Sequence, residues 1–226
     1  MVFVRHTLSM TPAAILFDFD GTILDTEWPV FSSIQQEFHL VGLEFPIEAW
    51  QEIVGTDGDL DWLGDLRRHL GDAFNEDEID TRRRAARDKM LHADGLRPGV
   101  RAVLDVAVGR GLQLAVASSS PTRWVHPHLR RIGLWETFHA VRTRDDVERA
   151  KPHPDLFLAA ADALGVAPAD CVAIEDSAHG CTSAKAAGVR VIAAPNRMTE
   201  VGDFSHADLL VDDLSDPRVF EFLGFP

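Results

Sequence analysis

The chain alternates short apolar runs with longer amphipathic stretches, and this alternation constrains its fold more than any other feature. Five apolar runs are predicted to be buried strands, at residues 13–17, 112–117, 171–174, 189–193 and 209–211. Five helix-like segments accompany them, at residues 100–108, 123–132, 155–164, 177–187 and 217–223. Strand–helix–strand units at this spacing favour parallel strands joined by helices. We therefore expect an α/β fold with a parallel sheet.

Residues 26–95 have a different pattern, with helical periods and almost no β-branched runs. This segment holds 7 Lys and Arg against 16 Asp and Glu, a net charge of −9 out of −14 for the chain. Within it, acidic residues 76–80 precede arginines 82–87, an order that complements a helix dipole. We predict a helical insert at 26–95 that interrupts a core formed by 1–25 and 96–226. Residues 1–10 are predicted to be a loose leader, and Met10 could itself initiate the chain.

Composition excludes several classes of protein. A length of 226 residues suits about one and a half domains. The acidic balance argues against nucleic-acid binding, which needs a basic surface. No stretch free of Asp, Glu, Lys and Arg exceeds 12 residues, so we expect no membrane span. Cys171 and Cys181 are the two cysteines, too few for a disulfide framework, and they favour a reducing, cytoplasmic location.

Polar side chains follow three of the predicted strands, where ligands bind in open parallel sheets. Asp18 and Asp20 follow the first strand, Ser118 the second, and Glu175 with Asp176 the third, while Lys151 precedes a helix. Four carboxylates at one edge repel one another and need a cation. Hard oxygen ligands suit Mg²⁺. Such a metal, with a lysine and a hydroxyl nearby, suits a phosphoryl group.

The Asp-x-Asp spacing has a chemical logic of its own. Residues i and i+2 of a strand point to one side, and Gly21 permits a tight turn directly afterwards. Both carboxylates can therefore face one substrate. One can attack phosphorus as a nucleophile and form an aspartyl phosphate. The other can protonate the leaving oxygen and then deprotonate water.

At this point the sequence resembles the haloacid dehalogenase-like hydrolases, and within them the β-phosphoglucomutase-like branch. The motifs that carry the resemblance are DFDGTILDTE at 18–27, VASSSP at 116–121, GLWETF at 133–138, KPHPD at 151–155 and IEDSAHGCTSAKAAG at 174–188. The resemblance implies a Rossmann-like core in three α/β/α layers, with a helical cap inserted after the first strand. That cap corresponds to the predicted insert at 26–95.

The resemblance also implies roles for individual residues. Asp18 would be the nucleophile and a Mg²⁺ ligand, and Asp20 the general acid and base and a Mg²⁺ ligand through its backbone carbonyl. Glu175 and Asp176 would complete the metal site. The expected phosphate-binding residues are Thr22, Ser118, Ser119 and Lys151.

Single positions separate the chemistries within this superfamily. Asp20 is present, and dehalogenase members lack it. Phosphonatase members need a cap lysine, and the cap has only Lys89, late in the arginine-rich helix. Phosphoglucomutase members carry a cap histidine where this chain has Val30, and a cap arginine where the loop 55–59 has no basic residue. We therefore expect a Mg²⁺-dependent phosphatase acting on a small phosphomonoester such as a sugar phosphate.

Two alternatives stay open: a sugar phosphomutase, and a non-catalytic module that keeps the fold and binds a metabolite. No obligate protein partner is indicated. The cap should select the substrate, with Glu27, Thr56 and Asp57 as candidate contacts. We also formed the hypothesis that the acidic loop disfavours a second phosphate on the substrate; its carboxylates are Asp57, Asp59, Asp61 and Asp65.

Overall fold

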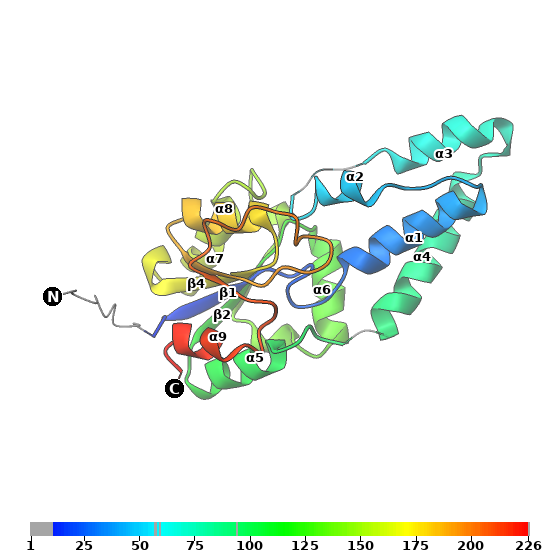
Figure 1. The fold of residues 1–226 in the computed structure, drawn as a ribbon. Helices are drawn as coiled ribbons and strands as arrows, with labels where there is room; N and C mark the ends of the chain where they lie inside the picture. The colour runs from blue at the N-terminus through cyan, green and yellow to red at the C-terminus, as the bar shows by residue number, and fades with distance from the viewer. Residues whose placement is uncertain (1–10, 57, 59, 94, 226) are drawn as a thin grey trace.

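A six-stranded parallel sheet forms the centre of the protein in the computed structural model, which describes residues 11–225 apart from 57, 59 and 94 (Figure 1). The strand order is β3-β2-β1-β4-β5-β6, and every pairing is parallel. The predicted α/β fold with a parallel sheet is thus confirmed. The strands are β1 (Ala14–Phe17), β2 (Gln113–Ala117), β3 (Ala140–Arg142), β4 (Cys171–Glu175), β5 (Arg190–Ala193) and β6 (Leu209–Leu210).

Helices cover both faces of this sheet and complete three layers. Residues of α5, α6 and α9 pack with side chains of one sheet face, and residues of α7 and α8 pack with those of the other. All four residues of β1 are buried, as expected for a central strand covered on both faces. The helices are α5 (Val100–Gly109), α6 (Thr122–Arg131), α7 (Asp155–Leu164), α8 (Ala178–Ala186) and α9 (Pro217–Phe222).

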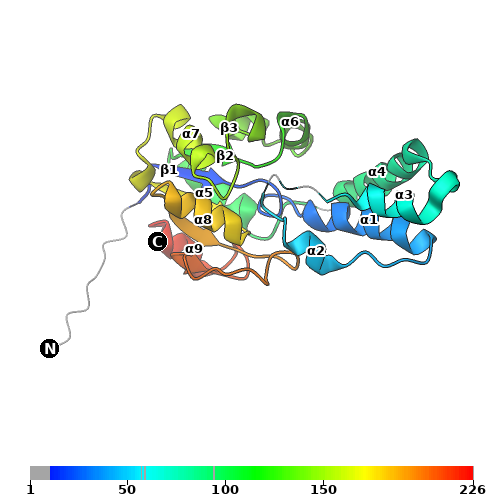
Figure 2. The same ribbon diagram turned by 90° about the horizontal axis from the view of Figure 1, so that it is seen from above.

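Four further helices follow β1 and project away from the sheet as a separate lobe (Figures 1 and 2). They have their own hydrophobic cluster, built around Phe31, Phe38 and Leu66, and α1 packs along α4. We call this lobe the cap; its boundaries at 25/26 and 95/96 stay a prediction. Its helices are α1 (Glu27–Leu40), α2 (Ile47–Gln51), α3 (Trp62–Leu70) and α4 (Glu76–Ala93).

One strand and four short turns were not foreseen. The three residues of β3 are all half-buried at the edge of the sheet, so they lack the continuous apolar run that identifies a central strand. The short 3₁₀ turns are Gly71–Ala73, Trp135–Thr137, Arg144–Asp146 and Pro168–Asp170. The predicted leader, residues 1–10, lies outside the described residues.

The longest of the described helices, α4, has 18 residues and is charged along most of its length. Across the described residues, we find no helix with the length and apolar character needed to cross a bilayer.

Candidate active site

Three buried carboxylates meet where β1 and β4 end side by side. The backbone N–H of Asp18 donates to the carbonyl of Ile174 at 2.9 Å, so the segment after β1 stays in register with β4. Asp18, Glu175 and Asp176 each offer an oxygen, and these three oxygens lie within 4.8 Å of one another. The strand ends predict that four carboxylates meet at this edge, and the side chains of three of them do so, which concentrates negative charge at a buried position.

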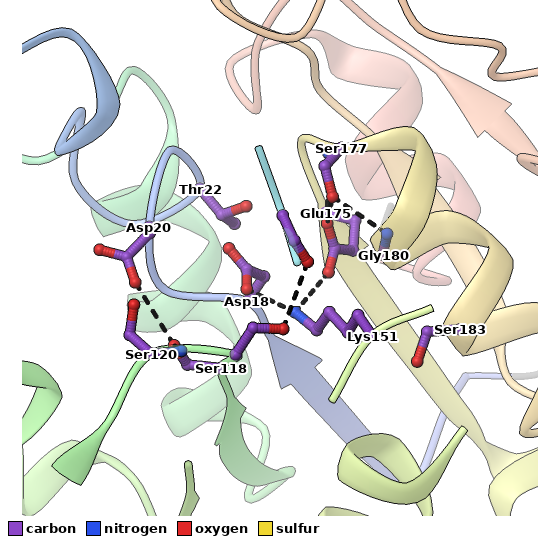
Figure 3. A network of polar contacts seen from close by, with 12 residues as sticks. Asp18, Asp20, Thr22, Ser118, Ser120, Lys151, Glu175, Ser177, Gly180 and Ser183 are labelled. Carbon is purple, nitrogen blue, oxygen red and sulfur yellow. Dashed lines mark hydrogen bonds and ion pairs between the residues drawn. The ribbon is translucent and has the colours of Figure 1, made fainter. Parts of the chain in front are cut away.

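The Lys151 ammonium lies between two of these carboxylates (Figure 3). Its Nζ donates to Oδ1 of Asp18 at 2.5 Å and to Oε1 of Glu175 at 2.6 Å, and the side chain is 1% exposed. Burial raises the pKa of Asp18 to about 7, although Lys151 opposes the shift. Burial acts to lower the pKa of Lys151, but Asp18 and Glu175 together raise it above its ordinary value. Lys151 is therefore a fixed positive charge beside Asp18.

Asp176 is held by two neutral donors. The hydroxyl of Thr22 donates to Oδ1 at 3.1 Å, and Nδ2 of Asn196 donates to Oδ2 at 2.7 Å. Burial, followed by the nearby Asp18 and Glu175, raises the pKa of Asp176 well above its usual range. Gly21 has a φ of +78°, and a Cβ there would collide with the Asp176 carboxylate, so the turn after Asp20 requires glycine.

The Thr22 hydroxyl contacts a carboxylate of the acidic cluster, and its expected role at the phosphate stays a prediction. Asn196 was missed, although it comes soon after β5 and the strand-end rule that found Asp18 and Glu175 could have found it too.

The acidic cluster fits a divalent metal ion. Three buried carboxylates lie together, and the one ammonium group among them pairs with Asp18 and Glu175, which leaves an excess of negative charge. The second oxygen of Glu175 is occupied by the N–H groups of Asp176 and Ser177 and by the Ser177 hydroxyl, at 3.1–3.2 Å. Mg²⁺ prefers oxygen ligands, usually one or two protein carboxylates together with waters and substrate phosphate oxygens. Asp18 and Asp176, with Glu175 nearby, are thus the residues that could hold Mg²⁺.

The Asp20 side chain does not join this cluster. Its Oδ1 accepts hydrogen bonds from the Thr26 hydroxyl at 2.8 Å and from the indole Nε1 of Trp124 at 2.7 Å, while the Ser118 hydroxyl donates to Oδ2 at 3.4 Å. Asp20 is thereby fixed next to Asp18 on the cap side of the sheet. Trp124, on α6, was not identified from the sequence, because nothing in its spacing marks it.

The serine loop after β2 joins the sheet to the cap. The Ser120 N–H donates to Oγ of Ser118 at 3.0 Å, while the Ser119 hydroxyl donates to the carbonyl of Gly55 at 3.2 Å. Ser118 is buried beside Asp20, whereas Ser119 contacts the cap, and phosphate binding by the two serines stays a prediction. Gly55 has a φ of +83°, and a Cβ there would collide with the Ser177 hydroxyl. The cap loop therefore lies directly on the rim of the core.

A cavity of about 250 Å³ lies in the cap, next to the Gly55 loop that contacts the core, and two of the predicted cap contacts, Glu27 and Thr56, line it. Trp50 Nε1 donates to Oε2 of Glu27 at 2.9 Å. Burial, then the charge of Asp20, raises the pKa of Glu27 to about 8. The Thr56 hydroxyl bonds within its own loop, donating to the Ile53 carbonyl at 2.7 Å. Asp57, the third predicted contact, lies outside the described residues.

With this geometry in place, comparison with known proteins identifies the family. The family model of haloacid dehalogenase-like hydrolases matches residues 12–188. The chain belongs to this family. The resemblance inferred from the motifs is thus confirmed, and with it the expectation of an enzyme whose relatives are phosphatases. Members of the family generally use Mg²⁺, which agrees with the buried acidic cluster.

Several relatives extend over nearly the whole chain. YhcW of Bacillus subtilis, whose name marks it provisionally as a phosphatase, is 38% identical over 203 residues, 90% of this chain and 92% of YhcW. Hexitol phosphatase B of Escherichia coli is 29% identical, covering 93% of this chain and 96% of its own. A mutant of CbbY from Rhodobacter sphaeroides, solved in complex with xylulose-(1,5)bisphosphate, superimposes with a TM-score of 0.72 at 28% identity, covering 91% and 96%.

Proposed function

We propose that this protein is a Mg²⁺-dependent phosphatase that hydrolyses a small phosphomonoester, a sugar phosphate or a similar metabolite, through an aspartyl phosphate on Asp18. The observation that carries the proposal is the Lys151 ammonium held between Asp18 and Glu175 at 2.5 and 2.6 Å, inside a buried carboxylate cluster. A structural salt bridge needs one carboxylate and one cation. Two carboxylates on one lysine, with the third carboxylate of Asp176 beside them, suit a site that also receives a divalent cation and a phosphate.

In the first half of the reaction, an Asp18 carboxylate oxygen attacks phosphorus and the bond from phosphorus to the leaving oxygen breaks. Asp20 gives its proton to that oxygen, so the alcohol leaves neutral. Lys151 offsets the negative charge that accumulates when Asp18 approaches the phosphate. Ser118 stands beside Asp20, where its hydroxyl can donate to a phosphate oxygen once substrate is bound.

In the second half, Asp20 is a carboxylate and removes a proton from water. The water oxygen attacks phosphorus, the bond between phosphorus and Asp18 breaks, and inorganic phosphate is released. Asp20 thus ends the cycle protonated, as it began it. The fixed hydrogen bonds from Thr26 and Trp124 hold its carboxyl group in place through both halves.

Mg²⁺, held by Asp18 and Asp176 with the Asp20 carbonyl and Glu175 in support, would neutralise the charge on the phosphoryl oxygens. The arrangement of donors around Asp176 keeps its carboxylate aimed into the cluster.

The cap supports a hydroxylated leaving group. Glu27, with its raised pKa, carries a proton at neutral pH and can donate a hydrogen bond to a hydroxyl of the substrate. Thr56 adds a second polar group in the same cavity. Hexitol phosphatase and the xylulose bisphosphate complex of CbbY are relatives that act on or bind phosphorylated sugars and polyols, which supports the same substrate class.

The two alternatives receive less support. A phosphomutase needs a group to return the phosphate to the sugar, and Val30 lines the cap cavity at the position of the mutase histidine. A non-catalytic module would not need Asp18, Asp20, Lys151 and Asp176 together in one site.

The test is hydrolysis of p-nitrophenyl phosphate with Mg²⁺, with EDTA, and by the variants Asp18→Asn and Asp176→Asn. We expect both variants and EDTA to lower turnover by at least about 10³-fold. Mg²⁺ should also raise the thermal unfolding temperature of the wild type by roughly 5–10 °C at saturation, and Asp176→Asn should abolish that rise. The exposed Asp105→Asn is the matched control. Full turnover by Asp18→Asn, or equal turnover in EDTA, would disprove the proposal.

A further inference from the structure

A second cavity, of about 410 Å³, lies between α4 of the cap and α6 of the core, and it is rich in arginine. We call it the arginine pocket. None of the described residues that line it is an aspartate or a glutamate. It is lined by Val30, Arg83, Arg84, Arg87, Ser120, Pro121, Arg123 and Trp124.

The pocket has more positive charge than its ion pairs neutralise. Arg83 and Arg84 share one carboxylate, Asp80, at 2.8 and 2.6 Å, and Arg87 pairs with Asp88 at 2.7 Å. Three guanidinium groups thus share two carboxylates, and Arg123 adds a fourth positive charge to the lining, in a chain whose net charge is −14. A local positive potential on an acidic protein attracts anions to that place and away from the rest of the surface.

The pocket adjoins the side of the site where the leaving group departs. Trp124 donates to Asp20 at 2.7 Å, and the Arg87 guanidinium lies 5.1 Å from the centre of the Trp124 indole. The backbone N–H of Ser120, also in the lining, donates to Ser118. Val30 and Arg83 line both this pocket and the cavity that contains Glu27, so the two hollows meet.

The ion pairs of α4 alone do not account for this arrangement. These pairs lie within α4 itself, and pairs between neighbouring side chains of one helix contribute only a few tenths of a kcal/mol to its stability, roughly 0.2–0.5 kcal/mol each. Here, however, arginines from α4 and Arg123 from α6 face one hollow, beside the candidate acid and base. Guanidinium groups bind phosphate oxygens in pairs through their fork of N–H donors, which lysine cannot do.

We propose that the arginine pocket binds a second phosphate group of the substrate, so that the preferred substrate is a bisphosphorylated small metabolite rather than a monophosphate. This rests on the proposed phosphatase function. The phosphate to be removed lies at Asp18. The second phosphate lies against Arg87 and Arg123, so that Asp20 stands between the two phosphates. The hydroxylated part between them lies near Val30 and Glu27.

The proposal reverses the hypothesis that the acidic loop disfavours a second phosphate. Asp61 caps α3 by accepting from the Gly64 N–H, and Asp65 pairs with Arg68. Both line a separate hollow of the cap, with Phe38 and Phe45. Asp57 and Asp59 lie outside the described residues. The described carboxylates of the loop are therefore occupied elsewhere and do not face the arginine pocket.

The test compares matched sugars as competitive inhibitors of p-nitrophenyl phosphate hydrolysis. The probes are fructose 1,6-bisphosphate against fructose 1-phosphate and fructose 6-phosphate, and glucose 1,6-bisphosphate against the two glucose monophosphates. In the wild type, at least one bisphosphate should have an inhibition constant about tenfold or more below its monophosphates, the gain from one charge-assisted contact. The readout is this ratio, so a change in turnover common to all inhibitors cancels.

The variants Arg87→Gln, Arg123→Gln and their double variant should bring the ratio towards one. Arg101→Gln, an exposed arginine on α5, should keep the wild-type ratio. Arg123 is exposed, so the Arg123→Gln variant should fold and can be tested even if the double variant unfolds. Equal inhibition by mono- and bisphosphates in the wild type, no inhibition by any bisphosphate, or an unchanged ratio in the variants would overturn the proposal.

The two proposals fail separately. If p-nitrophenyl phosphate is not hydrolysed, the proposed function fails, and calorimetric titration with the same sugars then tests the arginine pocket alone. If hydrolysis depends on Asp18 but the ratio is one, the phosphatase stands and the arginine pocket does not bind phosphate.

Discussion

The indole N–H of Trp124 donates a hydrogen bond to Oδ1 of Asp20 at 2.7 Å. The two residues lie 104 positions apart in the sequence, one at the start of α6 and the other just beyond β1. The same oxygen accepts from Thr26, so the candidate acid and base is held by one donor from the core and one from the entrance to the cap.

This contact leads to a prediction about the leaving group. Trp124→Phe removes the donor and keeps an aromatic ring, so the orientation of Asp20 should be lost while the fold remains. General acid catalysis contributes about 10²–10⁴-fold, and we expect a loss of about tenfold or more in kcat for alkyl phosphates. p-Nitrophenyl phosphate, whose leaving group needs no proton, should be affected much less. A loss that is equal for both kinds of ester would argue against a positioning role.

The buried ion triad predicts a large effect on stability. Lys151→Met leaves Asp18 and Glu175 facing each other without a cation, and breaking a buried pair in this way costs about 3–5 kcal/mol. Urea unfolding of the metal-free protein measures the loss. Lys185→Met is the matched control, because Lys185 pairs with Asp208 at the surface, where such pairs contribute about 0–1 kcal/mol. Similar losses for the two variants would contradict the expectation that Lys151 offsets the charges of Asp18 and Glu175 in the folded protein.

Glu27 predicts a pH dependence of stability. Its pKa of about 8 in the folded protein exceeds the ordinary value of 4.5, so between these values the folded state holds a proton that the unfolded state releases. Wild-type stability relative to Glu27→Gln should therefore fall as pH rises from about 4.5 to about 8, and then level off. Urea unfolding of both proteins at pH 5, 6.5 and 8.5 measures this difference. Glu52→Gln, at an exposed position of the cap, should show no such trend, and a flat difference for Glu27→Gln would count against the shift.

The contact between Gly55 and the core predicts a defect in substrate capture. A Cβ in Gly55→Ala would meet the Ser177 hydroxyl, so the cap loop could not rest on the rim of the core. We expect kcat/KM to fall by about tenfold or more, because the site would stay open to water. Gly71→Ala is a strict control: Gly71 also has a positive φ, but a Cβ there meets no atom within 4 Å. Equal activity of the two variants would show that loop contact is not needed.

Much of the fold could be predicted because its signals are local. The strands β1, β2, β4, β5 and β6 lie in short apolar runs, and the ends of β1, β2 and β4 mark Asp18, Ser118, Glu175 and Asp176 without knowledge of any contact. The edge strand β3 gave no such signal, since its three residues are half-buried. The arginines of α4 had a sufficient local explanation in the helix dipole, and the sequence did not indicate that several of them face α6.

The sequence by itself determined the order of the strands along the chain, the chemistry at their ends and the presence of a helical insert, because hydrophobic periodicity depends on neighbours a few residues apart. Only the tertiary structure decided that Lys151 lies between Asp18 and Glu175, that Trp124 holds Asp20, and that burial raises the pKa of Glu27. Each of these depends on which strands are neighbours in the sheet and on where the cap contacts the core. The strand order and the cap position bring together side chains that are far apart in the sequence.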